Sequence, residues 1–298
     1  MASNGGARHQ KSGKASFEHV YDREDPREYF RTLGVMDYRI PPHHGQRLFS
    51  TLVEGQRDGA GNGRRSGEPF TVVDLCCSYG INGALLKYDV TLDDLYERYG
   101  SQELDVLSPE ELAVADREFY GERRSEDALR VVGLDLAENA VSYGLRAGLL
   151  DDGVIENLEE REPTDRLREA VSGMDLLTVT GGIGYISERT FDQLLGCLPG
   201  DRVLWVATFA LRWVSYDAIA GVLSRYGLAT ERLESHTFDQ RRFRDVAEQE
   251  YVCGELESMG IDPEGKESEG SYHAHFHLSR PAGSSEASVE ELFEPVLR

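Results

Sequence analysis

Strand-like and helix-like patterns alternate along the chain from about residue 70 to residue 280. The apolar runs at 71–75 and 131–134 are rich in valine and do not alternate with polar residues, which is typical of strands buried on both faces of a parallel sheet. Segments with helical apolar spacing separate them from further strand-like runs. These further runs lie at 154–158, 174–179, 202–209, 229–236 and 271–278. The alternation predicts an α/β fold with a doubly wound, seven-stranded, mostly parallel sheet.

The segments around this core differ from it in composition. The first residues are polar and rich in glycine, and two helical patterns at 25–33 and 46–53 precede a second glycine-rich stretch. In order, the chain is expected to contain a disordered tail (1–16), an N-terminal helical cover with a linker (17–68), the core (69–282) with an acidic helical insertion (89–130), and a C-terminal tail (283–298). The insertion fits a lid, an oligomer contact or a solvated flank equally well.

Two strand ends carry the residues of a predicted nucleoside site. The first run continues into Asp74-x-Cys76-x-Ser78-x-Gly80, whose small residues allow a tight turn and bring backbone N–H groups close to a ligand. The second run ends at Asp135, the place where open α/β sheets position the acid that binds ribose hydroxyls. The alternative is structural, because a turn of small residues and a lone Asp that caps a helix occur in many α/β proteins.

This order of motifs resembles the class I S-adenosylmethionine (SAM)-dependent methyltransferases of small-molecule type, whose first motif is usually an acid followed by three alternate glycines. Asp74 and Gly80 match the motif, and Cys76 and Ser78 stand where glycines are usual. The resemblance implies a Rossmann-like methyltransferase fold, an antiparallel last strand and SAM as the cofactor. The residues that it assigns to the cofactor are Asp74, Cys76, Ser78, Gly80, Asp135, Leu136, Asn157, Leu158 and Thr180.

Acceptor chemistry is expected outside the carboxyl ends of the later strands. Gly181 and Gly182 follow the fourth strand and let an acceptor approach closely, although they also suit a plain turn. Tyr185 is a candidate to orient the acceptor, and His236 is a candidate general base, although an isolated histidine is more often not catalytic. Tyr29 in the N-terminal cover is a candidate acceptor contact, with simple aromatic packing as the alternative.

Three arginines are candidates to hold an anionic group of the acceptor. Arg241 and Arg242 lie between two phenylalanines, and Arg212 follows the fifth strand. Guanidinium groups bind carboxylates and phosphates through paired hydrogen bonds, so a carboxylate-bearing metabolite is one expected acceptor. Ion pairing with Asp239, Asp245 or Glu248 within the protein is the equally weighted alternative.

Charge and composition narrow the partners. A formal net charge of −22 and a pI near 4.7 disfavour nucleic acid and anionic membranes. The four cysteines show no metal or disulfide spacing, and the histidines at 273, 275 and 277 have no acidic neighbour in sequence, so no metal is expected. No signal or membrane-spanning run is recognisable, which predicts a cytoplasmic protein. The expected partners are a small-molecule substrate and, in a homodimer, a second copy of the chain.

The predicted function is transfer of a methyl group from SAM to an oxygen or nitrogen of a small metabolite. Two alternatives use the same site: an intramolecular displacement that releases methylthioadenosine, and a SAM-binding protein without catalytic activity. A NAD-dependent oxidoreductase is less favoured, because the loop lacks G-x-G-x-x-G and Asp135 comes much later than the acid of that motif.

Overall fold

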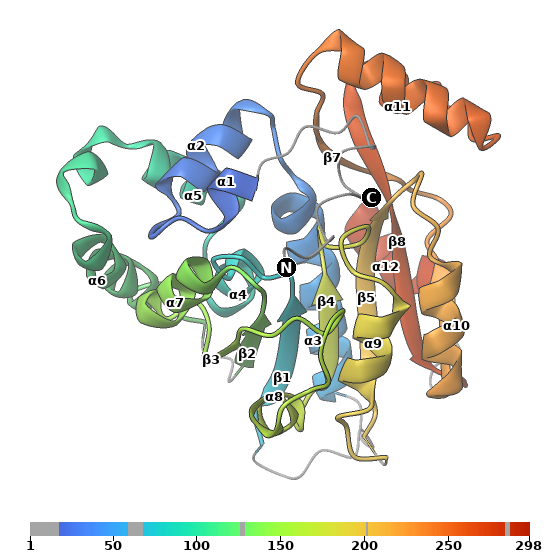
Figure 1. Cartoon of the computed structure of the whole chain (residues 1–298), viewed down its shortest axis with the longest axis horizontal. Coiled ribbons are helices and arrows are strands. Elements are labelled where there is room, and N and C mark those ends of the chain that lie inside the picture. Colours follow the sequence, from blue (N-terminus) through green and yellow to red (C-terminus); the bar gives the residue numbers. More distant parts are fainter. Residues whose placement is uncertain (1–17, 59–67, 126–128, 201, 284–286) are drawn as a thin grey trace, which may run out of the picture.

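The computed structural model describes residues 18–58, 68–125, 129–200, 202–283 and 287–298. Eight strands form a single sheet in the order β3-β2-β1-β4-β5-β8-β6, and β7 also pairs with β8 (Figure 1). The strands are β1 (Phe70–Leu75), β2 (Leu129–Leu134), β3 (Asp152–Val154), β4 (Leu176–Val179), β5 (Trp205–Leu211), β6 (Leu228–Arg232), β7 (Phe238–Arg242) and β8 (Ser271–Pro281). The expected doubly wound, mostly parallel sheet is confirmed.

Strand direction matches the order that the methyltransferase resemblance implies. The pairs of β1 with β2 and β4, of β2 with β3, and of β4 with β5 are all parallel, whereas β8 is antiparallel to β5 and to β6. All six side chains of β1 are buried, as the uninterrupted apolar run predicts. The carboxyl ends of β1, β2 and β4 therefore meet at one edge of the sheet.

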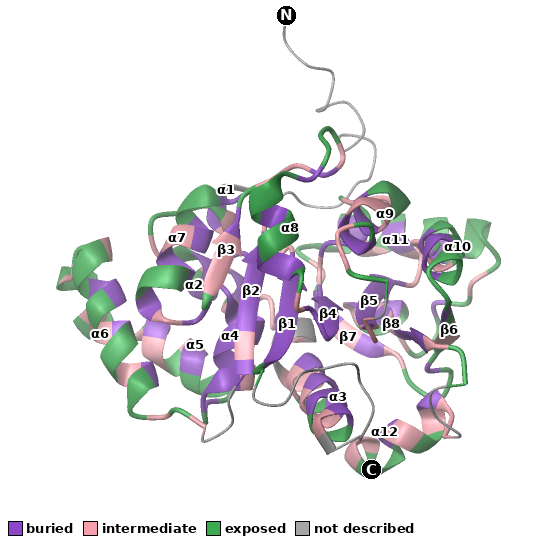
Figure 2. Ribbon diagram, turned by 90° about the horizontal axis from the view of Figure 1, so that it is seen from below, coloured by how far each residue is buried: buried purple, intermediate pink, exposed green. Residues whose placement is uncertain are grey.

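Helices cover both faces of the sheet. The α-helices are α1 (Glu18–Tyr21), α2 (Arg27–Val35), α3 (Gln46–Asp58), α4 (Ile81–Lys87), α5 (Leu92–Gly100), α6 (Pro109–Gly121), α7 (Glu138–Ala147), α8 (Asp165–Val171), α9 (Glu188–Leu195), α10 (Asp217–Arg225), α11 (Val246–Ser258) and α12 (Val289–Leu297). A π-helix, η3 (Ile40–Gly45), and two 3-10 helices, η4 (Gln102–Val106) and η5 (Glu267–Glu269), join them. Helices α3 and α12 pack on one face and α8, α9 and α10 on the other (Figure 2).

The N-terminal cover and the insertion form one helical group beside β2 and β3 (Figure 1). Buried side chains of α2, α4, α5, α6 and α7 share a hydrophobic cluster. Asp116 of α6 lies at its centre, fully buried, where its carboxylate accepts hydrogen bonds from Arg98, Tyr99 and Tyr143. The insertion is therefore packed against the core through α7.

Three sequence-based expectations need correction. The strand expected at 229–236 ends at Arg232, and the chain leaves the ladder before resuming as β7, which was not predicted. The expected C-terminal tail at 283–298 contains α12, whose Phe293 is fully buried and packs edge-on against Phe276 of β8 with 5.2 Å between ring centroids. The third strand, expected at 154–158, lies at Asp152–Val154, so only Val154 is shared. The expected tail at 1–16 and most of the linker lie outside the described residues.

Candidate active site

The loop after β1 adopts a left-handed backbone at each position where the motif usually has glycine. The φ angles are 61° at Cys76, 47° at Ser78 and 80° at Gly80. L-residues rarely adopt such values, because Cβ then approaches the carbonyl oxygen. The loop therefore keeps a glycine-type conformation although two of its three alternate glycines have been replaced, and it leads directly into α4.

Asp135 anchors this loop from the end of β2. Its Oδ2 accepts a hydrogen bond from the backbone N–H of Ser78 at 2.7 Å, and its Oδ1 accepts those of Leu136 at 2.7 Å and Ala137 at 3.0 Å. Because a carboxylate offers about four lone-pair positions, Oδ2 keeps capacity for a further hydrogen bond. The structure thus brings Asp135 and the β1 loop together, as the sequence predicts.

A buried polar network lies beneath the loop. Asp74 Oδ1 accepts hydrogen bonds from Asn82 Nδ2 and Thr178 Oγ1, both at 2.8 Å, and Asn82 Nδ2 also approaches Thr180 Oγ1 at 3.2 Å. Asp74 Oδ2 and Asn82 Oδ1 are buried and have no hydrogen-bond partner among the described residues. Burial raises the pKa of Asp74 to about 7, although the hydrogen bonds from Asn82 and Thr178 act in the opposite direction.

Exposed apolar side chains follow β2 and β3. Leu136 is 57% exposed and Ile155 is 44% exposed, and the two segments are joined by a hydrogen bond from Asp135 N to Val154 O. Leu158 is buried instead, and Asn157 uses its Oδ1 to accept the N–H of Glu159. Ile155 was missed from the sequence, because its exposure at a strand end has no sequence signal. Leu136 and Ile155 together suit an adenine ring, which is flat and largely apolar.

The loop after β4 lies next to the β1 loop. A Cβ on Gly182 would be 2.4 Å from Cys76 Sγ, so this position needs glycine. A Cβ on Gly181 would be 3.0 Å from the hydroxyl of Tyr38, which belongs to the N-terminal cover. Tyr185 ends the turn and is 50% exposed. Gly181, Gly182 and Tyr185 thus lie on the same edge as Cys76, as predicted.

The N-terminal cover is hydrogen-bonded to the cofactor edge. Ser78 Oγ donates to Tyr21 O at 3.3 Å, and the hydroxyl of Tyr79 accepts the N–H of Arg23 at 2.8 Å. Asp22 Oδ1 accepts the N–H of Asn139 at 2.7 Å, in the first turn of α7. A carboxylate at this position satisfies a backbone donor and interacts favourably with the helix dipole. These bonds place Tyr21 and Tyr29 above the β1 loop.

His236 does not join this group. It is exposed in the segment between β6 and β7, and its Nδ1 pairs with Ser235 Oγ, which in turn donates to Glu290 in the first turn of α12. Its edge of the sheet is four strands from β1, which is about 19 Å at a spacing of about 4.8 Å per strand. A histidine in a loop is expected to be accessible, but the sequence does not show which strand end it faces. His236 therefore could not be excluded as a general base from the sequence.

The arginines expected to hold an anion are paired within the protein. Arg241 is buried and contacts Glu248 at 2.8 Å, and the same carboxylate accepts the hydroxyl of Tyr272. Arg212 is paired with Glu267. Arg242 is exposed and lies 3.7 Å from Asp37. The alternative of internal ion pairing therefore holds for the two buried arginines, and they do not form an anion clamp.

The three alternating histidines are packed individually. His277 stacks on Tyr216 with 4.2 Å between ring centroids, and His273 Nδ1 lies 3.2 Å from Thr237 Oγ1. Burial lowers the pKa of His275 and of His277 to about 4. Within the described part of the chain, no group of three His, Cys, Asp or Glu side chains is arranged to hold a metal ion. In the same residues, no helix has the length and apolar character needed to cross a membrane.

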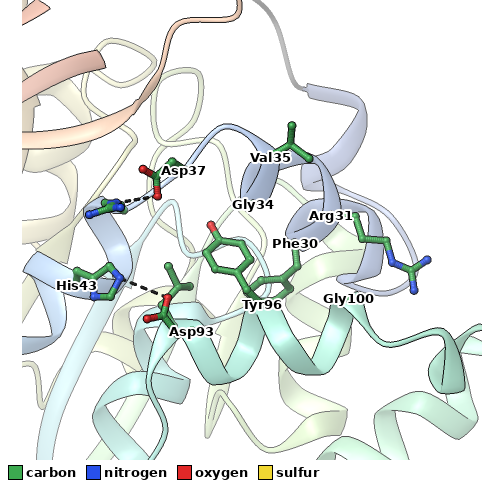
Figure 3. A pocket seen from close by; sticks show the side chains of 11 residues that line it. Phe30, Arg31, Gly34, Val35, Asp37, His43, Asp93, Tyr96 and Gly100 are labelled. Carbon is green, nitrogen blue, oxygen red and sulfur yellow. Dashed lines mark hydrogen bonds and ion pairs between the residues drawn. The ribbon is translucent and has the colours of Figure 1, made fainter. Parts of the chain in front are cut away.

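A separate hollow of about 800 Å³ lies between α2 and α5, outside the cofactor edge (Figure 3). Its apolar side chains are Phe30, Val35, Leu92 and Tyr96. Its charged groups pair with one another or with neighbours: Arg39 with Asp37 at 2.8 Å, and His43 with Asp93 at 3.5 Å. The hollow therefore presents few uncommitted polar groups.

No protein-family model and no curated protein matches the chain. Solved structures that resemble it include a TehB-like SAM-dependent methyltransferase from Corynebacterium glutamicum, with 14% identity, 79% of this chain and 87% of that chain covered, and a TM-score of 0.36. Magnesium protoporphyrin IX methyltransferase from Synechocystis with bound SAM has 13% identity and a TM-score of 0.36, with 79% of this chain and 80% of that chain covered. A SAM-dependent methyltransferase from Geobacter sulfurreducens in complex with S-adenosylhomocysteine has 13% identity and a TM-score of 0.36, with 85% of this chain and 98% of that chain covered.

The strand order and the antiparallel β8 match the fold that the methyltransferase resemblance implies, and the loop after β1 keeps a glycine-type backbone against Asp135. At such low identities and TM-scores, the solved structures add no assignment of activity.

Proposed function

We propose that this protein transfers a methyl group from SAM to an oxygen or nitrogen atom of a small molecule. The observation that carries the proposal is the loop after β1, which holds left-handed φ angles at Cys76, Ser78 and Gly80 while Asp135 binds its backbone. Such a conformation costs stability at non-glycine residues, so its retention favours a ligand-binding role over a plain turn.

The residues present fit a nucleoside with a charged methionine-like tail. Asp135 would hold ribose hydroxyls through the remaining capacity of its carboxylate, and Leu136 and Ile155 would contact the adenine. Asp135 and the net charge of −22 favour a cationic ligand. Asn157 is less suited to the base edge than expected, because its side-chain oxygen already accepts a hydrogen bond from Glu159.

Bound SAM supplies an electrophilic methyl carbon: the acceptor lone pair forms the new bond to it, the C–S bond breaks, and the electron pair stays on sulfur. The proton of the acceptor leaves to water. The chain's contribution is positioning and exclusion of bulk water. Gly181 and Gly182 allow close approach at the end of β4, Thr180 is fixed by Asn82, and Tyr21, Tyr29 and Tyr185 cover the edge.

Calorimetric titration with SAM and separately with NAD tests the proposal. We expect the wild-type protein to bind SAM and not NAD, and Asp135→Ala and Asp135→Asn to weaken SAM binding by at least tenfold. Asp165→Ala, an exposed carboxylate in the first turn of α8, is the matched control. Melting temperatures of all variants separate loss of binding from loss of folding. Absence of SAM binding by the folded wild type would refute the proposal.

Product analysis then distinguishes the reactions that SAM binding permits. Formation of S-adenosylhomocysteine with a methylated acceptor supports methyl transfer, whereas methylthioadenosine indicates intramolecular displacement. Binding without any product, despite a broad acceptor screen, would indicate a catalytically silent protein. Cys76 and Ser78 at the usual glycine positions give that last outcome its structural motivation.

A further inference from the structure

Two buried tyrosines differ from all the other buried tyrosines of the described chain. Nine tyrosines are buried. Seven of them use their hydroxyl in a hydrogen bond within the protein, as Tyr79 does with the backbone of Arg23 and Tyr88 with Gly148 O at 2.6 Å. Tyr29 and Tyr38, which are 4% and 6% exposed, have no such bond among the described residues. Their hydroxyl oxygens are not among the buried side-chain atoms that lack a partner, so they reach accessible space and are open to a ligand.

Both side chains belong to the N-terminal cover and face the proposed methyl-transfer edge. The hydroxyl of Tyr38 lies so close to Gly181, directly after β4, that a Cβ there would be 3.0 Å from it. The ring of Tyr29 packs edge-on against Tyr79 of the β1 loop and against Tyr21, each with 5.7 Å between ring centroids. The two hydroxyls therefore belong to one site, at the meeting point of the β1 and β4 loops.

The hydroxyls are neutral hydrogen-bonding groups. Burial raises the pKa of Tyr29 well above its ordinary value, and the proximity of Tyr38 and Tyr21 adds to the effect. Burial does the same for Tyr38. Each phenol can then donate one hydrogen bond and accept others, without contributing charge.

Local charge argues against an anionic acceptor. Arg241, whose charge acts on Tyr38, has its guanidinium paired with the buried Glu248, and Arg212 is paired with Glu267. Asp135 adds negative charge to the cofactor edge. A carboxylate placed here would lose its hydration without gaining a dedicated cationic partner, which is costly.

We infer that Tyr29 and Tyr38 bind the acceptor through their hydroxyls, and that the acceptor is an uncharged small molecule with hydroxyl or carbonyl oxygens. The inference rests on the proposed methyl transfer, whose acceptor it specifies. It replaces the expectation of a carboxylate-bearing metabolite. The phenols orient the acceptor, and the loop at Gly181 allows its reacting atom to approach the methyl carbon.

The test uses Tyr29→Phe and Tyr38→Phe in the full chain, with Tyr88→Phe as the matched control. Tyr88 is equally buried, but its hydroxyl has a protein partner. We expect the melting temperature to stay the same or rise for the two site variants and to fall for the control. A fall for the site variants as large as that of Tyr88→Phe would mean that their hydroxyls are structural, and would overturn the inference.

Acceptor chemistry is tested with tritiated methyl-SAM and two pools of small molecules, one of neutral alcohols, phenols and amides and one of the matching carboxylates. We expect labelling in the neutral pool, a loss of at least tenfold in kcat/KM for the site variants, and unchanged SAM affinity by calorimetry. Tyr88→Phe should keep wild-type turnover. Labelling confined to the carboxylates, or in neither pool while SAM binds, would overturn the acceptor class.

The two proposals fail in different ways. A loss of SAM affinity in Tyr29→Phe or Tyr38→Phe would place the hydroxyls on the cofactor and overturn their assignment to the acceptor. If the wild type does not bind SAM at all, methyl transfer itself is refuted. The melting temperatures still report whether the two hydroxyls serve the fold.

Discussion

The left-handed backbone at Cys76 and Ser78 makes a quantitative prediction about glycine and alanine at these positions. At an ordinary position glycine is less stable than alanine by about 0.5 to 1 kcal/mol, because it loses more backbone entropy on folding. A left-handed conformation costs an L-residue about 1 to 2 kcal/mol, a cost that glycine does not have. We therefore expect the glycine variant to be more stable than the alanine variant by about 0.75 kcal/mol at 76 and at 78.

Comparison of glycine with alanine removes the side-chain contributions from the measurement. Both variants at 76 lose the contact between Cys76 Sγ and Gly182, and both variants at 78 lose the hydrogen bond to Tyr21 O. Cys77 is the control within the same loop, because it is buried and is not among the residues with positive φ. There glycine should be less stable than alanine by about 0.5 to 1 kcal/mol.

Urea unfolding of the three glycine and alanine pairs provides the assay. The free energies are comparable where the slope against urea concentration is unchanged. The difference between the pairs at 76 and 77 isolates the backbone strain, expected at about 1 to 2 kcal/mol. If glycine is less stable than alanine at 76 and 78 by the same amount as at 77, the loop is not left-handed and the argument for a ligand-binding loop fails.

Two further predictions concern buried carboxylates. Asp116→Ala should lower the free energy of unfolding by about 3 to 5 kcal/mol, since it leaves Arg98 without its buried partner. Urea unfolding measures this loss, with the exposed Glu118→Ala as the control. A loss below about 1 kcal/mol would contradict the role of Asp116. For Asp74, burial raises the pKa from 3.8 to about 7, so the folded state favours the protonated form: stability is full below about pH 4 and falls as the pH rises to about 7. The free energy of unfolding falls by at most about 4 kcal/mol, at about 1.36 kcal/mol per pH unit. Asp74→Asn should flatten the pH dependence of this free energy between about pH 4 and 7. Equal slopes in both proteins would show that Asp74 stays ionised.

The central strands and their loops could be predicted because local sequence determines them. Continuous valine-rich runs identify β1 and β2, and the spacing of small residues identifies the turn after β1. The end of the chain was missed although its signal is present: Ser288 and Glu291 form a capping box, and Val289 and Phe293 share one helical face. The break between β6 and β7 has no comparable signal, because it depends on how the two strands pair along β8.

The functional residues also divide into those whose place is fixed by local sequence and those whose place depends on contacts between distant segments. Asp135 was predictable because a strand end fixes its position. The pairing of Arg212 depends on Glu267, which is 55 residues away, so sequence proximity could not reveal it. The site of Tyr38 depends on the folding of the N-terminal cover over Gly181, a contact between segments more than one hundred residues apart.

The cover contains anchoring and uncommitted tyrosines, and this difference is itself evidence of function. Tyr79 secures the segment through Arg23, and Asp22 binds the first turn of α7, so the cover does not need hydroxyl bonds from Tyr29 or Tyr38 to stay in place. The two hydroxyl oxygens are not among the buried side-chain atoms that lack a partner, so they reach accessible space at this edge. Phenylalanine would keep the burial of each ring. The fold therefore does not require tyrosine at 29 and 38, and the presence of tyrosine at both positions is accounted for by a ligand that pairs with the hydroxyls.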